Sequence, residues 1–139
     1  MRNSIDDLDY KILAHLKKDA RIPYVTIAND LKVSEGMIRQ RVKKLVEHGI
    51  VRRFTVITTS HGIKAIIEVS VEVNVHTTDI ANSIKQLDGV ENVFEVSGNK
   101  DIVVIVDVDN SLRLNDLIEK IRLMKNVENT ETKLVLKEI

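Results

Sequence analysis

The sequence has 139 residues, enough for one ordinary domain or two small ones, and its 43% hydrophobic and 30% charged residues are typical of a folded chain. It lacks cysteine, which excludes disulfides, thiolate nucleophiles and Cys-based zinc sites, and no apolar run reaches the roughly 20 residues that a membrane helix needs. Because the N-terminus has no apolar signal segment either, we expect a cytoplasmic protein.

The two parts of the chain carry opposite charges, although the net charge of the whole is zero. Residues 1–53 contain 12 Lys or Arg and 7 Asp or Glu, a net charge of +5, whereas residues 54–139 contain 9 and 14, a net charge of −5. This division predicts that the first part binds a polyanion and the second does not. Charge alone does not distinguish such a surface from an ordinary solvated one.

Hydrophobic residues at helical spacing predict three helices in the first part, over residues 6–16, 24–31 and 34–48. Pro23 suits the start of the second helix, and Ser34 is a good N-cap for the third. Two short helices joined by a tight turn match the helix-turn-helix motif. We therefore expect a three-helix, winged-helix-like domain that binds DNA.

The third predicted helix explains why DNA is the expected ligand. Ile38, Val42 and Leu45 form its buried face, so the opposite face is polar and basic. Side chains near the N-terminus of such a helix reach base edges in the major groove, where Arg39 can pair with guanine and Gln40 with adenine. The predicted DNA contacts, to bases first and to phosphates further along, are Ser34, Glu35, Gly36, Met37, Arg39, Gln40, Lys43, Lys44, Arg52 and Arg53. For each residue taken singly, a solvated helix face is the alternative.

Arg41 lies next to the buried stripe of the same helix, beside Ile38 and Val42. We predict a structural role for it, in an ion pair with an acidic residue of the first helix such as Asp9. Direct contact with DNA is the alternative.

The rest of the chain begins with a predicted strand over Phe54–Thr58 and a turn at Thr59–Gly62. Apolar and polar residues then alternate strictly from Ile67 to Val75, which predicts a strand with one buried face. The remaining predicted elements are a helix from about Asp79 to Gly89, strands over 90–96, 102–106 and 130–136, and a helix that begins after a cap at Ser111 and stops near Asn126.

The order of these elements is β-α-β-β-α-β, the ferredoxin-like arrangement of α+β proteins. The two halves repeat, since Val-Glu-Asn occurs at residues 90–92 and again at 127–129. Both helices then cover one face of the sheet, so we expect a second subunit to bury the Val and Ile side chains of the other face. The predicted parts are a helix-turn-helix domain at 1–53, a strand and linker at 54–64, and a ferredoxin-like domain at 65–139.

A basic helix-turn-helix, a strand and a ferredoxin-like domain in this order resemble the Lrp/AsnC family, also called feast/famine regulators. The resemblance covers nearly the whole length and depends on the order and spacing of its pieces. The matching pieces are Ile5-Asp6-Asp7-Leu8-Asp9 with Ile12-Leu13, Asp19-Ala20-Arg21, Ile27-Ala28, Leu31, Ser34, Ile38, Arg41-Val42, Leu45, Gly49-Ile50-Val51 and the Gly98-x-x-Asp101 turn. The chain departs from the family at Met37, where threonine is common, and in its short Thr59–Gly62 connection.

The resemblance implies a homodimer, often joined into octamers, that binds double-stranded DNA and senses an amino acid near the turn that matches Gly98 to Asp101. An amino acid needs backbone N–H groups for its carboxylate, which Gly98 lets approach closely, and an acid such as Asp101 for its ammonium group. The predicted effector-binding residues are Gly98, Asn99, Lys100, Asp101, Thr130 and Thr132. An ordinary hairpin turn and ordinary strand threonines are the alternatives.

Two other functions are alternatives to a regulator. Some siroheme decarboxylases resemble this architecture, but none of the four histidines belongs to a recognisable metal motif and no Gly-rich phosphate loop occurs. We therefore expect no enzyme activity, no catalytic residue, no metal and no cofactor, with an amino acid as the effector. The second alternative is an architectural protein, which would bind unrelated duplexes with similar affinity.

Overall fold

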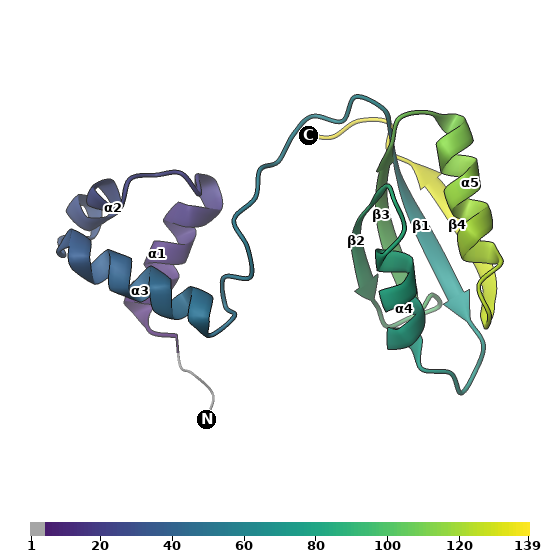
Figure 1. Ribbon diagram of the computed structural model, residues 1–139, viewed down its shortest axis with the longest axis horizontal. Helices are drawn as coiled ribbons and strands as arrows, with labels where there is room; N and C mark the ends of the chain where they lie inside the picture. Colours follow the sequence, from purple (N-terminus) through teal and green to yellow (C-terminus); the bar gives the residue numbers. More distant parts are fainter. Residues whose placement is uncertain (1–4) are drawn as a thin grey trace. The chain divides into compact units, whose positions relative to one another are not determined.

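Two compact units make up the chain, and the division between them falls after Ile57. The computed structural model describes residues 5–139, so the first four residues of the predicted DNA-binding domain lie outside the described residues. Each unit has its own helices (Figure 1) and its own hydrophobic core.

The N-terminal unit consists of the helices α1 (Asp7–Lys18), α2 (Tyr24–Leu31) and α3 (Glu35–Glu47), which confirms the three predicted helices to within two residues at each end. Reciprocal capping bonds start α1: the Asp6 carboxylate accepts from the Asp9 N–H, and the Asp9 carboxylate accepts from the Asp6 N–H. The buried core is formed by Ile12, Leu16, Ile27, Ala28, Ile38, Val42 and Leu45.

The turn between α2 and α3 joins them as a helix-turn-helix motif. Lys32 ends α2 in the left-handed conformation, with φ of 56°, and the Val33 N–H then donates to the Ala28 carbonyl at 3.0 Å. Ser34 caps α3, because its Oγ accepts from the Met37 N–H at 3.2 Å. This cap makes α3 begin at Glu35, directly after Ser34.

The predicted strand over Phe54–Thr58 is wrong, since this segment forms no strand. Its apolar side chains are exposed, from 50% at Phe54 to 74% at Val56 and 93% at Ile57. A strand needs a neighbour that satisfies its backbone N–H and C=O groups, and β-branched composition cannot supply one.

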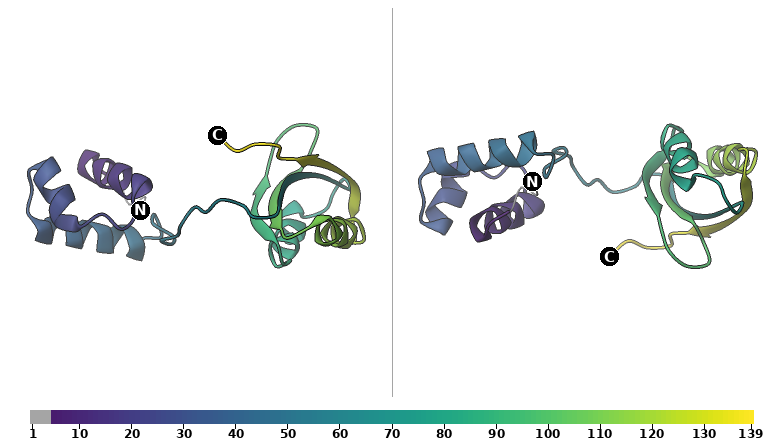
Figure 2. Two further views of the ribbon diagram at one scale, coloured as in Figure 1. Left: turned by 90° about the horizontal axis from the view of Figure 1, so that it is seen from above. Right: turned by 90° about the horizontal axis from the view of Figure 1, so that it is seen from below.

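The C-terminal unit is a four-stranded antiparallel sheet with two helices, and it confirms the predicted α+β fold and ferredoxin-like order. The strands lie in the order β2-β3-β1-β4, and α4 and α5 cover the same face of the sheet (Figure 2). The elements are β1 (Ile63–Val71), α4 (Thr77–Lys85), β2 (Val90–Glu95), β3 (Ile102–Val108), α5 (Ser111–Arg122) and β4 (Val127–Leu134).

Several predicted boundaries in this unit are wrong. β1 begins at Ile63 rather than Ile67, and β4 spans Val127–Leu134 rather than residues 130–136. The first strand ends at Val71 rather than Val75, and Val73 is 85% exposed, because Asn74 has a φ of 67° that no strand continues through. The cap of α5 is Asn110 rather than Ser111, since the Asn110 Oδ1 accepts from the Arg113 N–H at 3.1 Å. The strand end was misplaced because Val73 and Val75 continue the apolar alternation beyond the strand, and the cap was misplaced because Asn110 and Ser111 are both good capping residues.

Buried and partly exposed residues alternate along the two central strands, β1 and β3, and the buried ones form the core of this unit. Every second residue of β1 and β3 is buried beneath the helices, and Ile84 of α4 and Ile121 of α5 are fully buried against them. The intervening residues lie on the face that the helices leave open. None of the helices described between residues 5 and 139 is long and apolar enough to cross a membrane.

Candidate nucleic-acid interface

One face of α3 is buried and the other is open to solvent. Ile38, Val42 and Leu45 pack into the core, whereas the predicted DNA-contacting residues lie outside it. Exposed to solvent are Ser34, Glu35, Gly36, Met37, Arg39, Gln40, Lys43, Lys44, Arg52 and Arg53. A Cβ placed on Gly36 would have no neighbour within 4 Å, so the described chain leaves this turn of the helix free for close approach. Exposure on one helical face is what insertion into a groove requires.

Two neighbours hold Arg39 on this face. Its Nη2 donates to the Glu35 Oε1 at 2.6 Å, one helical turn away. Its guanidinium carbon lies 5.3 Å from the ring centroid of Tyr24, the first residue of α2, within cation–π range. Arg39 is thus ordered by side chains from both helices of the motif.

A hollow lies beside α3 on the side of α1, and it contains three of the predicted contacts, Met37, Gln40 and Lys44. Its complete lining is Ile5, Asp9, Met37, Gln40, Arg41, Lys44, Leu45, His48 and Ile50. On the neighbouring side, the Lys43 Nζ lies 3.8 Å from the Glu47 Oε1, a loose exposed pair that leaves the ammonium group accessible.

Arg41 joins α3 to α1, as predicted. Its Nη1 donates to the Asp9 Oδ1 at 3.2 Å and also to the Asp6 Oδ2, so it bonds both residues of the α1 capping box. The side chain is about one-third exposed and points to α1, so these bonds confirm the structural role.

The Gly98–Asp101 turn is tied to the sheet by Asp101. The Asp101 N–H donates to the Val69 carbonyl at 3.0 Å, and the Asp101 Oδ2 accepts from the Val71 N–H at 2.9 Å. Gly98 has a φ of 131° and no heavy atom within 4 Å of a Cβ position, so its backbone is open to approach. Lys100 is drawn away from the turn by Glu131, at 3.6 Å.

The two predicted threonines lie elsewhere in the same subunit. Thr130 is buried on the helix-covered face, where its Oγ1 accepts from the Arg122 Nε at 2.9 Å. Thr132 follows two residues later on β4 and pairs with Ile67, so it shares that face. Within one chain the structure brings Asp101 and Gly98 together but not the threonines.

Family models match both units. A model described as the AsnC-type helix-turn-helix domain matches residues 5–46, and one described as the Lrp/AsnC ligand binding domain matches residues 64–139. The chain belongs to the Lrp/AsnC family. The HTH-type transcriptional regulator LysM of Saccharolobus solfataricus is 42% identical over 135 residues, which span 96% of this chain and 95% of that protein.

Solved structures share the architecture over nearly the full length. E. coli AsnC superposes with a TM-score of 0.77 at 26% identity, over 97% of this chain and 94% of that one. A regulator from Neisseria meningitidis, solved as an L-Met complex, gives 0.81 at 23% identity, over 98% and 92%. With the helix-turn-helix geometry, these relationships make this Lrp/AsnC protein a DNA-binding transcriptional regulator.

Tyr24 is a functional candidate that the sequence analysis missed. As the first residue of α2 it lies partly buried against the N-terminal core, and its ring lies against the Arg39 guanidinium. An aromatic residue directly after Pro23, at the start of the helix that precedes the recognition helix, was the available signal.

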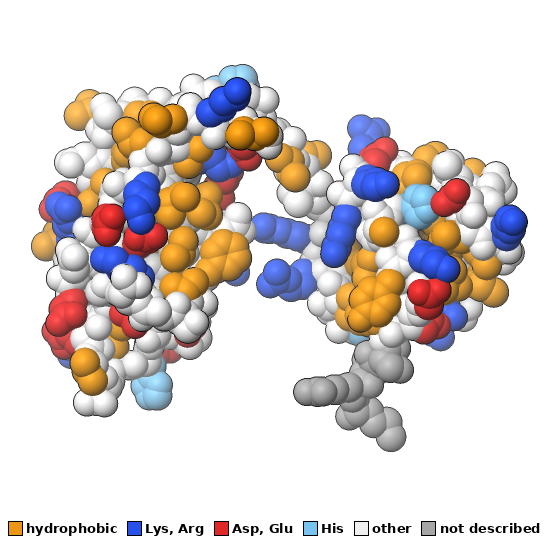
Figure 3. Space-filling view, turned by 180° about the vertical axis from the view of Figure 1, so that it is seen from behind, with side chains coloured by type: hydrophobic (Ala, Val, Ile, Leu, Met, Phe, Trp, Pro, Cys, Tyr) orange, Lys and Arg blue, Asp and Glu red, His pale blue; other side chains and the backbone are white. Residues whose placement is uncertain are grey.

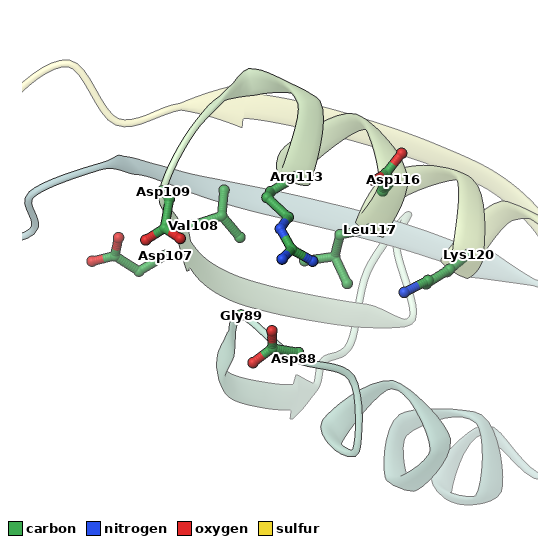
Figure 4. Close-up of a pocket in the computed structure, with 9 residues that line it drawn as sticks. All are labelled: Asp88, Gly89, Asp107, Val108, Asp109, Arg113, Asp116, Leu117 and Lys120. Carbon is green, nitrogen blue, oxygen red and sulfur yellow. The ribbon is translucent and has the colours of Figure 1, made fainter.

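A second hollow lies in the C-terminal unit of this Lrp/AsnC regulator, outside the predicted sites. Arg113 and Lys120 extend from α5 toward the turn at Asp88 (Figure 4). The lining consists of Asp88, Gly89, Asp107, Val108, Asp109, Arg113, Asp116, Leu117 and Lys120. Asp107 is already bonded by the Ser60 Oγ at 2.7 Å, and the part of the chain that the structure describes holds no group of three or more acidic or histidine side chains fit for a metal ion.

The Asp6–Arg41 bond predicts a defined acid sensitivity. Hydrogen bonds from Arg41 first, and from the Asp9 N–H second, lower the pKa of the Asp6 carboxyl below its ordinary value of 3.8. A carboxyl with a lowered folded-state pKa stabilises the fold above its unfolded-state pKa, and this contribution is lost as the pH falls through the folded-state value. We predict that wild type melts at a higher temperature than Asp6→Asn near neutral pH, and that the difference shrinks as the pH falls below 3.8 and vanishes below the lowered folded-state pKa.

Thermal unfolding followed by far-UV circular dichroism measures this difference. Asparagine caps helices as well as aspartate does, so Asp6→Asn removes the charge and keeps the cap. Asp7→Asn is the matched control, because among residues 5–139 Asp7 pairs with Lys11 of its own helix alone, at 2.8 Å, and removal of its charge should have a smaller effect. A difference for Asp6→Asn that is the same at all pH values would contradict the ionic role.

Proposed function

We propose that this regulator recognises particular duplex sequences through the exposed face of α3, and that an amino-acid effector modulates its assembly or its DNA affinity. The observation that carries the first part is the exposed row on a capped helix: Arg39 and Gln40 near its start, followed by Lys43 and Lys44. Donors near the start of a recognition helix suit base edges, and cations further along suit phosphates. We propose that the protein acts in the cytoplasm, where a DNA-binding regulator meets its ligand, and we propose no catalytic role.

The Gly98–Asp101 turn is the proposed effector site. The family model for this part of the chain is a ligand-binding domain, and one structural neighbour was solved with L-Met, an amino acid. Gly98 leaves its backbone open to a carboxylate. The Asp101 Oδ2 is bonded to the Val71 N–H, and we assign its Oδ1 to the ammonium group.

The open face of the sheet supports the proposed homodimer. Ile66 faces Ile105 across β1 and β3, and Phe94 faces Val103 across β2 and β3, which forms an apolar strip. Figure 3 shows this face, where hydrophobic side chains lie beside Lys and Asp/Glu side chains. The charged border includes the pairs Lys133–Glu68 at 2.7 Å and Lys100–Glu131 at 3.6 Å. An apolar strip with a polar border is the composition of a protein interface, and we propose that dimers join further into octamers.

Selection from a random duplex pool tests the DNA-binding part. The full chain should enrich duplexes with two half-sites about one helical turn, or a multiple, apart, because a dimer presents two recognition helices. Affinity for the enriched duplex should exceed that for a shuffled one by at least about a thousandfold. Equal affinity for both, with the same salt dependence, would favour the architectural alternative.

A thermal-shift panel of the twenty amino acids tests the effector. At 100 times its dissociation constant, a ligand should stabilise the protein by about 2.7 kcal/mol. We predict that Asp101→Asn abolishes this shift without loss of DNA binding, because asparagine can still accept from the Val71 N–H but no longer carries the charge that holds the ammonium group. An unchanged shift in Asp101→Asn would exclude Asp101 as the ammonium ligand.

Substitution of Phe94 tests the dimer. Phe94 is 51% exposed in the single subunit, and Phe94→Glu would place a charge within the proposed apolar interface. We predict a shift toward monomer in sedimentation velocity. Leu112→Glu is the matched control: Leu112 is 76% exposed on α5, on the other side of the sheet, and its substitution should leave the dimer intact. A dimeric Phe94→Glu protein would place the interface elsewhere.

A further inference from the structure

We infer that Tyr24 and Glu35 are positioning residues that determine DNA specificity, because together they hold the Arg39 guanidinium for a base edge and keep it from phosphates. The inference rests on the proposed contact between α3 and DNA. It goes beyond that proposal in assigning specificity to a residue of α2 and to a carboxylate that acts through its neighbour.

The two contacts engage different parts of one guanidinium group. Glu35, the first residue of α3, binds the edge of the group through its Oε1, 2.6 Å from the Arg39 Nη2. Tyr24 lies against its face, 5.3 Å from the guanidinium carbon to the ring centroid. The Tyr24 side chain is itself partly buried against the N-terminal core, which restricts its movement.

An ordered Arg39 favours specific binding. A long, exposed side chain loses rotamer freedom when it is fixed against a base, and this loss weakens binding. The Arg39 side chain is 66% exposed, yet the contacts with Glu35 and Tyr24 favour this arrangement before DNA binds. The guanidinium has five N–H donors and Glu35 takes one of them, so a two-donor edge is left for guanine O6 and N7.

The Glu35 charge acts against non-specific binding. Attraction between cations and phosphates is the same for every sequence and supplies most non-specific affinity. A carboxylate bonded to Arg39 offsets that attraction at this position and repels a phosphate directly. The pair of Lys43 with Glu47 is looser, at 3.8 Å, so Lys43 is left available to the backbone.

The test compares two dissociation constants for each variant of the full chain. One is for the duplex that the wild-type protein selects from a random pool, and the other is for a shuffled duplex of the same length and composition. We expect Tyr24→Leu to lower the ratio of the two affinities about two- to fivefold, the factor that one exposed cation–π contact contributes. The variant Tyr24→Phe should keep the wild-type ratio, because a phenyl ring keeps that contact.

Glu35→Gln should lower the same ratio in a different way. Its affinity for the shuffled duplex should rise, with a salt slope steeper by up to about one unit, because one more cation becomes available to phosphates. Asp7→Asn removes a carboxylate from a comparable exposed pair, Asp7–Lys11, and is expected to leave the ratio unchanged.

A double-mutant cycle separates positioning from a general structural effect. In an Arg39→Ala background, neither Tyr24→Leu nor Glu35→Gln should change the ratio further, since both act through Arg39. An unchanged ratio in both single variants, or equal effects with and without Arg39, would overturn the inference. A wild-type protein that binds the selected and shuffled duplexes equally would instead contradict the proposed function itself.

Discussion

The bonds from Arg41 to Asp6 and Asp9 attach the middle of α3 to the start of α1, and the surface that we propose for DNA binding depends on this attachment. The same two aspartates cap α1, so one cluster fixes both the beginning of a helix and its packing partner. A recognition helix must keep its orientation while phosphates pull on its outer side. Arg41 is bound within the unit, whereas the basic side chains on the outer face are exposed and are the ones that we propose for DNA contact.

The two faces of the C-terminal sheet also differ. The helices of the same subunit cover one face and leave the other exposed. Alternate residues of β1 and β3 bury completely under the helices, whereas Ile66, Val103 and Ile105 are left on the open face. Asp101 ties the start of β3 to the end of β1 through Val69 and Val71. An effector bound by Asp101 would thus act on the same two strands that we propose to meet in the dimer, which gives ligand binding a direct route to assembly.

Helices and strands with a regular apolar pattern could be predicted from the sequence, because the spacing of their apolar residues shows which face is buried. The three N-terminal helices, the ferredoxin-like order and the pairing of Arg41 with Asp9 follow from the position of apolar stripes and of charges beside them. The prediction of a strand at Phe54–Thr58 failed because a strand needs a neighbouring strand to pair with, and local composition does not reveal one. The aromatic residue after Pro23 marks Tyr24 as a candidate, but its contact with Arg39 depends on how two helices cross, and the bond from Asp101 to Val71 depends on sheet register, so neither contact could be predicted from the sequence.

Amide chemical-shift mapping tests the central claim, that the exposed face of α3 meets DNA. The full ¹⁵N-labelled chain would be titrated with the duplex that it selects. The account predicts the largest shift changes at residues 34–44, at Arg52 and Arg53, and at Tyr24 beneath Arg39, with small changes across the sheet. Changes centred on the C-terminal unit, with α3 unaffected, would contradict it.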